Sequence, residues 1–144
     1  MVRDVVVHPG AVVVLAVDGD ELLFVRQYRY AVQESLLELV AGTCEVGEDP
    51  LTTADRELQE EAGFKAGRLS KIGEFFSAPG FCSELLHLYL AEDLSPSRLP
   101  GDEDEEILLE RIPIPEAVRM ALSGQFRDAK TLVGVLLYAQ RRLG

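Results

Sequence analysis

The stretch Gly42–Phe64 reads GTCEVGEDPLTTADRELQEEAGF, and its pattern predicts a short helix between two turns. Asp49 is a favourable N-cap residue, and Pro50 suits the first helical position. Gly63 is placed to end the helix in a left-handed conformation. At about 100° per residue, the apolar positions share one side that we expect to face a core. These positions are Leu51, Ala54, Leu58 and Ala62.

Three carboxylates gather on the neighbouring flank of this helix, because residues three and four positions apart are neighbours. They belong to Glu57, Glu60 and Glu61. Like charges so placed repel, and a bound divalent cation would remove that cost, since hard cations such as Mg2+ prefer carboxylate oxygens. Taken alone, three glutamates are more simply explained as a solvated acidic face. Support for a metal site must therefore come from the residues around these glutamates.

The composition is typical of one globular domain. The 144 residues, 47% hydrophobic and 27% charged, are enough to bury a sizeable core. The net charge of −11 argues against binding to nucleic-acid polymers, but a small phosphorylated substrate is compatible if metal ions bridge it to carboxylates. Neither a signal peptide nor a membrane span is evident, which favours a cytoplasmic location with ordinary thiols at Cys44 and Cys82.

The rest of the chain predicts strands followed by two closing helices. Strands are expected at Ala11–Val17, Glu21–Gln27, Ser35–Ala41, Leu69–Ser77, Glu84–Ala91 and Ile107–Ile114, and helices at Pro115–Ser123 and Asp128–Leu143. Between the second and third strands, Tyr28-Arg29-Tyr30 is either an amphipathic strand end or a stacking surface with a phosphate-binding fork. Five consecutive acids, 102–106, would ordinarily form a solvated loop.

At its fixed positions the opening stretch resembles the Nudix box, G-x5-E-x7-R-E-U-x-E-E-x-G-U, where U is a bulky aliphatic or aromatic residue. The matching residues are Gly42, Glu48, Arg56, Glu57, Leu58, Glu60, Glu61, Gly63 and Phe64. The resemblance implies an α/β (α+β) Nudix fold in one domain, 1–144, with a mixed β-sheet sandwiched between α-helices. It also implies hydrolysis of a nucleoside diphosphate linked to another group, with Mg2+ or Mn2+ as the cofactor.

The resemblance extends to the ADP-ribose pyrophosphatase branch of the family. It is carried by HPGAVVVLAV, VRQYRY, LLELVAG, SAPGF and DAKTL, and by Pro79, sixteen residues beyond Gly63. The implied reaction converts ADP-ribose, or a similar nucleoside diphosphate sugar, to AMP and ribose 5-phosphate. The implied assembly is a homodimer, in which an N-terminal segment pairs with the other subunit and helps hold the adenine. Because the sequence begins almost at His8, the adenine site is not assigned.

The resemblance also implies a metal site. Glu57 and Glu61 are the implied principal ligands, with Glu60 assisting. The carbonyl of Ala41 is an expected extra oxygen, and Glu105 is placed for a further metal contact.

Positioning and acid–base roles are implied for other acidic and basic residues. Arg56 is expected to pair with a box carboxylate and hold it in position, whereas Glu48 is either a ligand or a structural residue. A general base must take a proton from the attacking water. Matching the family pattern before Ile107 puts that base at Glu103, with Glu106 as the alternative.

Substrate contacts are expected from the other resembling stretches. Arg29 is the expected phosphate contact, and Arg26 is a weaker one. Tyr28 or Tyr30 is expected to stack a base. The sugar side is expected to be shaped by Pro79, Gly80 and Phe81. Glu84 is expected either to bond a hydroxyl or to support the metal. His8 and His87 fit packing or strand positions, and we assign them no role.

Two other functions compete with hydrolysis of ADP-ribose. One is hydrolysis of nucleoside triphosphates or of other nucleotide sugars, against which Pro79 and VRQYRY argue. The other is a nucleotide-sugar-binding sensor without catalysis, which should show eroded box carboxylates. This sequence has all of them.

Overall fold

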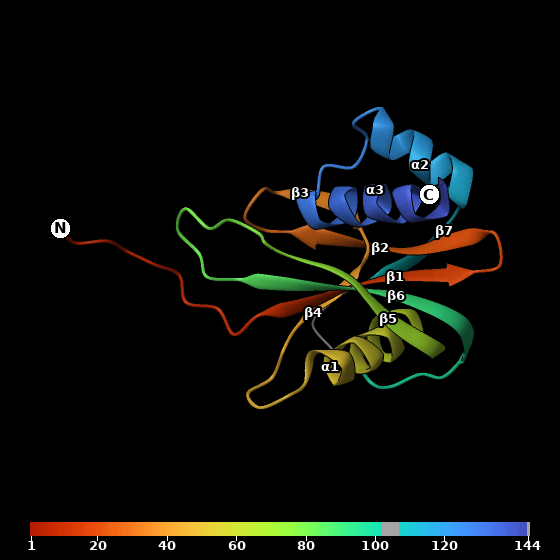
Figure 1. Cartoon of the computed structure of the whole chain (residues 1–144), viewed down its shortest axis with the longest axis horizontal. Helices are drawn as coiled ribbons and strands as arrows, with labels where there is room; N and C mark the ends of the chain where they lie inside the picture. The colour runs from red at the N-terminus through yellow and green to blue at the C-terminus, as the bar shows by residue number, and fades with distance from the viewer. Residues whose placement is uncertain (102–106, 144) are drawn as a thin grey trace.

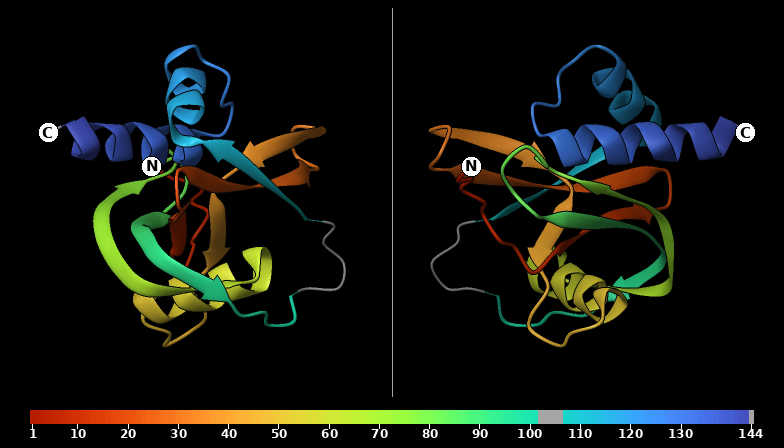
Figure 2. Two further views of the ribbon diagram at one scale, coloured as in Figure 1. Left: turned by 90° about the vertical axis from the view of Figure 1, so that its right-hand side faces the viewer. Right: turned by 60° about the vertical axis from the view of Figure 1, so that its left-hand side comes forward.

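The expected mixed sheet and helices are present in the computed structural model, which describes residues 1–101 and 107–143. The elements are β1 (Ala11–Asp18), β2 (Glu21–Arg29), β3 (Glu34–Glu38), β4 (Val40–Thr43), α1 (Pro50–Glu57), η1 (Leu58–Ala62), β5 (Phe64–Phe76), β6 (Leu85–Pro96), β7 (Leu108–Pro113), α2 (Ile114–Leu122) and α3 (Ala129–Leu143). Helix α1 lies on one side of the sheet, and α2 and α3 lie on the other (Figure 1). Two further views show the same three layers (Figure 2).

Two apolar clusters hold these layers together. On the side of α2 and α3, Phe24 and Leu88 of the sheet pack with Val135 of α3. On the side of α1, Val14 of β1 packs with Leu58 of η1. Each of these five side chains is fully buried, so helices on both sides are needed to keep the sheet from water. Within the described ranges, no helix is both long enough and apolar enough to cross a membrane.

Strand β1 organises the sheet because both of its edges are paired. One edge pairs in parallel with β6, from Ala11 opposite Leu86 to Ala16 opposite Ala91. The other edge is shared, since β4 pairs with the first half of β1 and β2 pairs with its last residues. Strand β2 then continues beside β3 and β7. Strand β1 therefore has β2, β4 and β6 as its neighbours in the sheet.

The strand expected at Ser35–Ala41 is two strands, β3 and β4, which separate at Leu39. The N–H of Leu39 donates to Oγ1 of Thr131 on α3 at 3.0 Å. Because this donor is directed at a helix side chain, the ladder is interrupted there. The chain then changes its partner from β2 to β1.

The central helix differs from the prediction in two respects. Ala54, Leu58 and Ala62 are buried as expected, but Leu51 is 46% exposed, because its place in the first turn leaves it outside the apolar cluster that contains the others. The helix also changes geometry after Glu57, where α1 gives way to the π-helical turn η1. Such turns are rare in proteins as a whole, and those that occur are often located at functional sites.

The N-terminal end of the chain extends away from the body of the molecule, and the rest of the N-terminal segment, residues 1–8, leads back to it (Figure 1). It is attached through Val6, whose N–H donates to the carbonyl of Phe81 at 2.7 Å and whose carbonyl accepts from the N–H of Ser83 at 2.9 Å. Val6 and Cys82 form a parallel bridge. The loop before β6 and the N-terminal segment therefore support each other.

Candidate active site

A cavity of about 780 Å³ opens beside the glutamate-rich helix. Its lining comes from β1, β2, β4, α1, η1, β6 and α3, and from segments before β1, after β4, before β6 and between β6 and β7. The predicted site residues in this lining are Arg29, Ala41, Arg56, Glu57, Glu60, Glu61 and Glu84. The structure thus brings the expected metal ligands and the expected phosphate contact into one space.

One side of the cavity, here called the acidic wall, consists of Glu57, Glu60 and Glu61. Glu57 is 9% exposed, and its carboxylate lies against the Cα of Gly42. A Cβ at Gly42 would overlap the carboxyl group of Glu57, so a close approach requires glycine there. Glu61 Oε2 accepts from the N–H of Ala41 at 3.2 Å. Strand β4 therefore supports two of the three carboxylates.

Arg56 lies among these carboxylates and divides its donors between them. Its Nη1 donates to Glu57 Oε1 at 3.0 Å and to Glu60 Oε2 at 3.1 Å. Its Nε and Nη2 donate to Glu48, both at 3.0 Å. The hydrogen bond to Glu48, the charge of Glu57 and the hydrogen bond to Glu60 together raise the pKa of Arg56. The expected pairing of Arg56 with box carboxylates is observed, and it offsets part of their repulsion.

Glu48 anchors Arg56 from the loop before α1. Its Oε1 also accepts from Thr53 Oγ1 at 2.7 Å and from the N–H of Glu45 at 3.1 Å. The hydrogen bond from Arg56 makes the largest contribution to lowering the pKa of Glu48 to about 2. Glu48 does not line the cavity, so the observed contacts are those of a structural residue.

Both ends of the helical run are as predicted. Asp49 Oδ1 accepts from the N–H of Leu51 at 2.9 Å, as an N-cap should, and Pro50 begins the helix. Gly63 ends the run with a φ of +75°, which favours glycine. These fixed ends hold the acidic wall in place against β4.

The acidic wall supplies the donor type that a hard divalent cation requires. Three carboxylates face a polar cavity, and such oxygens are the ligands that Mg2+ prefers. In the arrangement seen here, Arg56 draws Glu57 and Glu60 toward itself. Within 1–101 and 107–143, no three His, Cys, Asp or Glu side chains are arranged to hold an ion. The donors fit a metal in kind, and the ligand set stays a prediction.

Another side of the cavity, here called the basic wall, consists of Arg29 at the end of β2 and Lys130 in the first turn of α3. Nε and Nη2 of Arg29 donate to the two oxygens of Glu38, each at 2.7 Å. Nζ of Lys130 donates to Glu38 Oε1 at 2.6 Å. Glu38 is 1% exposed, and burial by itself would raise its pKa. The hydrogen bond from Arg29 and the charge of Lys130 outweigh that effect and lower the pKa of Glu38.

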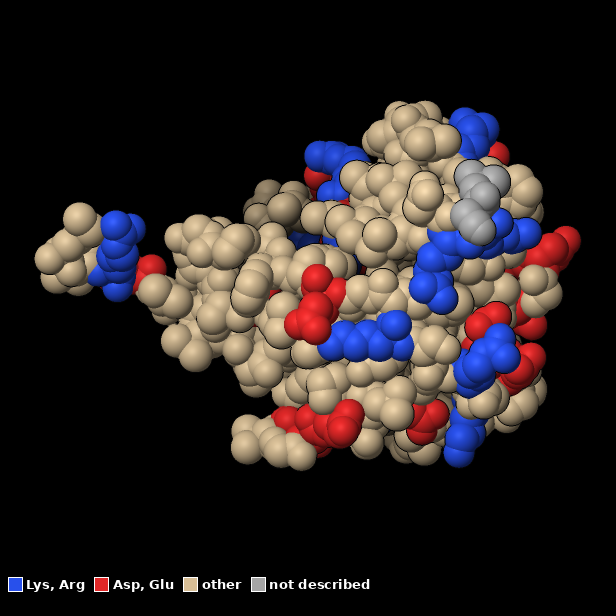
Figure 3. Space-filling model, viewed as in Figure 1, with Lys and Arg blue, Asp and Glu red and all other residues tan. Residues whose placement is uncertain are grey.

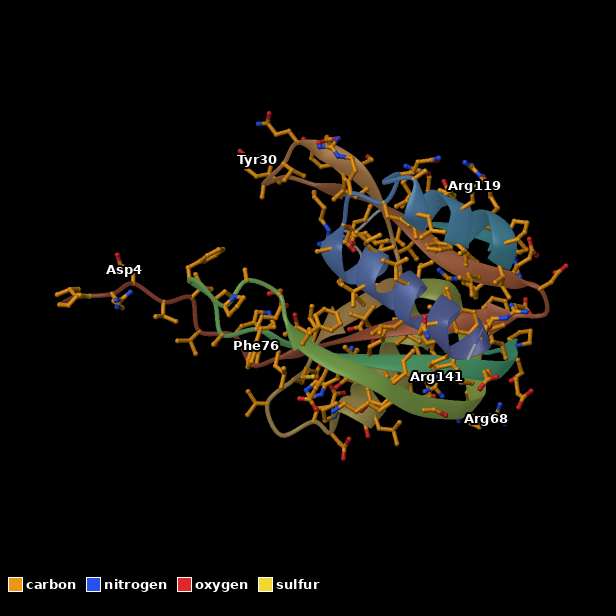
Figure 4. The ribbon with its side chains drawn as sticks, turned by 45° about the horizontal axis from the view of Figure 1, so that its top comes forward. Asp4, Tyr30, Arg68, Phe76, Arg119 and Arg141 are labelled. Carbon is orange, nitrogen blue, oxygen red and sulfur yellow. The ribbon has the colours of Figure 1, made fainter. Side chains whose placement is uncertain are left out.

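Strand alternation separates the predicted substrate residues of β2. Gln27 and Arg29 both line the cavity, as residues two apart on a strand should. Arg26 and Tyr28 do not line it: Arg26 is paired with Glu110 of β7, and Tyr28 is 56% exposed. Tyr30 lies at the tip of the β2–β3 hairpin, again outside the lining (Figure 4).

The predicted loop residues Pro79, Gly80 and Phe81 lie outside the main cavity. They line a second, smaller cavity of about 240 Å³ together with Val5 of the N-terminal segment. Glu84, at the end of the same loop, does line the main cavity. The three residues expected to shape the sugar side therefore do not line the main cavity, whereas Glu84 does, and its contact with a substrate or metal stays a prediction.

His8, to which no role was assigned, lines the main cavity beside Glu84. Its Nδ1 accepts from the N–H of Gly10 at 3.0 Å, so in the neutral ring the proton is on Nε2. That nitrogen lies 3.4 Å from Glu84 Oε2. His8 therefore orients Glu84, a contact that no motif in the sequence indicates.

Three predicted residues, Glu103, Glu105 and Glu106, lie outside the described ranges. Sequence reasoning in turn missed Glu38, Lys130 and Glu45, the last of which also lines the cavity. Glu38 belongs to LLELVAG and Lys130 belongs to DAKTL. Neither stretch indicates that the two side chains form a hydrogen bond with each other.

The NUDIX domain family matches residues 7–133, a span that includes both walls of the cavity. The chain therefore belongs to the Nudix family of hydrolases. Members of this family generally use divalent metal ions.

Individual proteins are similar to this chain over most of its length. The ADP-ribose pyrophosphatase of Bacillus subtilis is 40% identical over 136 residues, which cover 92% of this chain and 74% of that protein. The methanol dehydrogenase activator of Bacillus methanolicus is 38% identical over 136 residues, with coverage of 92% and 74%. A crystal structure of an ADP compounds hydrolase matches with a TM-score of 0.84 at 28% identity, over 91% of this chain and 71% of the other. The predicted fold is thereby confirmed.

Proposed function

We propose that this chain hydrolyses ADP-ribose, or a similar nucleoside diphosphate sugar, to AMP and ribose 5-phosphate. The observation that carries the proposal is that the acidic wall and Arg29 line one cavity, of a size that suits a small molecule. Carboxylates that hold metal, beside a guanidinium that binds phosphate, are what hydrolysis at a pyrophosphate requires. The name of the Bacillus subtilis relative supports ADP-ribose as the substrate.

We propose Mg2+ as the cofactor, with Mn2+ as the alternative. Glu57 and Glu61 would hold it, with Glu60 and the carbonyl of Ala41 as further oxygens, since these residues line the cavity. When bound, the ion neutralises charge on the pyrophosphate and acidifies a water molecule.

The side chains of the protein have three tasks in this proposal. Arg56 keeps Glu57 and Glu60 in position, because it binds both carboxylates at once. Arg29 directs a guanidinium into the cavity, where it binds a phosphate of the substrate. Glu103 takes the proton from the attacking water, an assignment that rests on the family pattern before Ile107.

One assay tests the substrate assignment. The protein is incubated with Mg2+ and, separately, with ADP-ribose, other nucleotide sugars, dinucleoside polyphosphates and nucleoside triphosphates, and the products are identified. We expect the highest kcat/KM with ADP-ribose, giving AMP and ribose 5-phosphate. Faster turnover of triphosphates or of another nucleotide sugar would show that ADP-ribose is not the preferred substrate. Binding of ADP-ribose without formation of product would favour a sensor.

The assignment of the base has its own test. Glu103→Gln should lower kcat by roughly 100-fold or more, because general-base catalysis contributes on that order. Metal affinity, measured by titration with Mn2+, should change little. If Glu105→Gln or Glu106→Gln has this effect and Glu103→Gln does not, the base is the residue whose substitution lowers kcat.

We also propose that the chain forms a homodimer through its N-terminal end. Val5, Val6 and Val7 are each more than half exposed, and Phe76 and Phe81 nearby are exposed to a similar degree. On the face shown in Figure 3, this end of the molecule is largely uncharged apart from one basic and one acidic patch close to the N-terminus. Such apolar exposure favours a protein contact. Light scattering after gel filtration should give twice the mass of one chain, and a monomer at micromolar concentration would contradict the proposal.

A further inference from the structure

The first turn of α3 is attached to the sheet at the junction between β3 and β4. Asp128 Oδ2 accepts from the N–H of Thr131 at 3.2 Å and from its hydroxyl at 2.5 Å, which caps the helix. Thr131 Oγ1 in turn accepts from the N–H of Leu39. A Cβ on Gly134 would lie 2.6 Å from Leu39 Cδ1, so the helix backbone passes close to the junction. The start of α3 is therefore fixed relative to Glu38, the residue before Leu39.

Lys130 uses this fixed position to reach a buried carboxylate. Its Nζ donates to Glu38 Oε1 at 2.6 Å and to both oxygens of Asp128 at 3.0 Å. The side chain of Lys130 is 15% exposed, and that of Glu38 is 1% exposed. An ammonium has three N–H donors, and the contacts with Glu38 and Asp128 occupy them. Although Lys130 lines the cavity, its geometry is that of a residue that holds another residue in place.

Glu38, held by Lys130, in turn restricts the orientation of the Arg29 guanidinium. Its two oxygens take Nε and Nη2 of Arg29, which fixes the plane of the guanidinium. Among the described residues, Nη1 of Arg29 has no hydrogen-bond partner, and Arg29 lines the cavity. Nη1 therefore keeps two N–H donors for a ligand in the cavity.

We propose that Lys130 is a positioning residue for the phosphate site. By holding the carboxylate of Glu38, it fixes the guanidinium of Arg29 so that Nη1 is directed at a phosphate of the substrate. The proposal rests on the proposed function, because it assumes that Arg29 binds a substrate phosphate.

The physical reason lies in the number of partners that Glu38 has. With Lys130 present, one carboxylate oxygen accepts from two cations and the other from one. Without Lys130, Glu38 loses a charged hydrogen bond in a buried place, where such bonds matter most. The carboxylate can then rotate, and the guanidinium rotates with it.

The kinetic test compares Lys130→Met with Lys130→Arg. Methionine keeps the apolar stem but cannot donate, whereas arginine can still donate to Glu38. We expect Lys130→Met to raise KM for ADP-ribose about tenfold with kcat changed less than threefold, because Arg29 binds the phosphate in both ground and transition states. Lys130→Arg should restore KM to within about threefold of the parent value. Lys71→Met is the matched control, since Lys71 pairs with Glu74 outside the cavity.

A second measurement reports on Arg29 directly and does not depend on turnover. The Nε–H signal of Arg29 in a 15N-edited NMR spectrum is assigned by its loss in Arg29→Lys. Because this proton is bonded to buried Glu38, its exchange with water should be slow in the parent protein and at least about tenfold faster in Lys130→Met. Lys71→Met should leave the exchange rate unchanged.

The results separate failure of this inference from failure of the proposed function. Unchanged KM in Lys130→Met, or unchanged exchange at Arg29 Nε–H, overturns the positioning role. So does a variant that is only less stable, with kinetic constants like those of the parent. If the parent does not hydrolyse ADP-ribose, the proposed function fails, and the positioning role is then judged by the exchange rate and by KM for whichever panel compound is cleaved.

Discussion

The acidic wall and the basic wall of the cavity treat charge in opposite ways. On the acidic wall, Arg56 is shared by Glu48, Glu57 and Glu60, so carboxylates outnumber the cation that holds them. On the basic wall, Arg29 and Lys130 face Glu38 and Asp128 in equal number. An excess of negative charge suits a wall that must attract metal ions. A neutralised pair of cations suits a wall whose task is to orient one guanidinium.

The walls also differ in how far apart in the chain their residues lie. The acidic wall and its supports come from one continuous stretch, residues 41–63. The basic wall joins β2, β3 and α3. Because the acidic wall is proposed to hold the metal, changes to it should act on turnover. Because the basic wall is proposed to orient Arg29 toward a phosphate, changes to it should act on the affinity for substrate.

The largest effect is expected from the acidic wall. Glu57→Gln and Glu61→Gln should each lower kcat by roughly 100-fold or more, because an amide binds a hard cation far less well than a carboxylate. The far-ultraviolet circular dichroism should be unchanged. Glu116→Gln, in an exposed pair on α2, is the control. Near-normal turnover in either variant would contradict the ligand assignment.

A smaller loss is expected when the acidic wall is displaced without changing its charge. In Gly42→Ala, the new Cβ overlaps the carboxylate of Glu57, which is buried and must move. We expect kcat to fall by about 10- to 100-fold, as when a catalytic group is misplaced by about 1 Å. Gly73→Ala on β5 is the control, since its Cβ would meet only the ends of two leucine side chains, Leu137 Cδ1 at 3.3 Å and Leu88 Cδ2 at 4.0 Å. Equal activities in the two variants would mean that Glu57 can move aside freely.

On the basic wall, Arg29→Lys should raise KM more than it lowers kcat. Lysine keeps the charge but cannot form the planar double hydrogen bond with Glu38, so KM should rise about tenfold. The control is Arg119→Lys, because Arg119 forms the same kind of fork with Glu116 on the surface of α2 (Figure 4). A loss confined to kcat would place Arg29 at the reacting group and not at a bound phosphate.

The smallest effect concerns a support of the acidic wall and depends on pH. The pKa of Glu48 is lowered to about 2, so its pairing with Arg56 stabilises the fold above the ordinary glutamate range and is lost as the pH falls toward 2. Glu48→Gln should lower the free energy of unfolding by about 1 to 2 kcal/mol at pH 7. The difference should shrink below pH 4, as measured by urea denaturation. A difference that is independent of pH would show that ionisation of Glu48 does not contribute.

The acidic wall was predictable because its determinants are local. Asp49, Pro50 and Gly63 set the ends of the helix, and the spacing of the glutamates sets their common side. The π-helical turn and the exposed Leu51 were not predictable from a regular repeat of 100° per residue.

The basic wall was only partly predictable. Arg29 lines the cavity as expected, and the strand period alone separates it from Arg26, three residues earlier, which does not line it. The partnership of Glu38 with Lys130 depends on where α3 docks, a tertiary contact that no local pattern records. The break between β3 and β4 has the same origin, because it depends on Thr131.

The attachment of Lys130 to Glu38 also has a consequence for biosynthesis. Every carboxylate of the acidic wall has been translated by residue 61, but the side chain that fixes Arg29 comes almost seventy residues later. Strand β1 must likewise wait for β6, since Ala11 pairs with Leu86. A nascent chain on the ribosome therefore has the carboxylates of the acidic wall long before it has an ordered place for the substrate. Full affinity for the substrate is expected to appear only when α3 has left the exit tunnel.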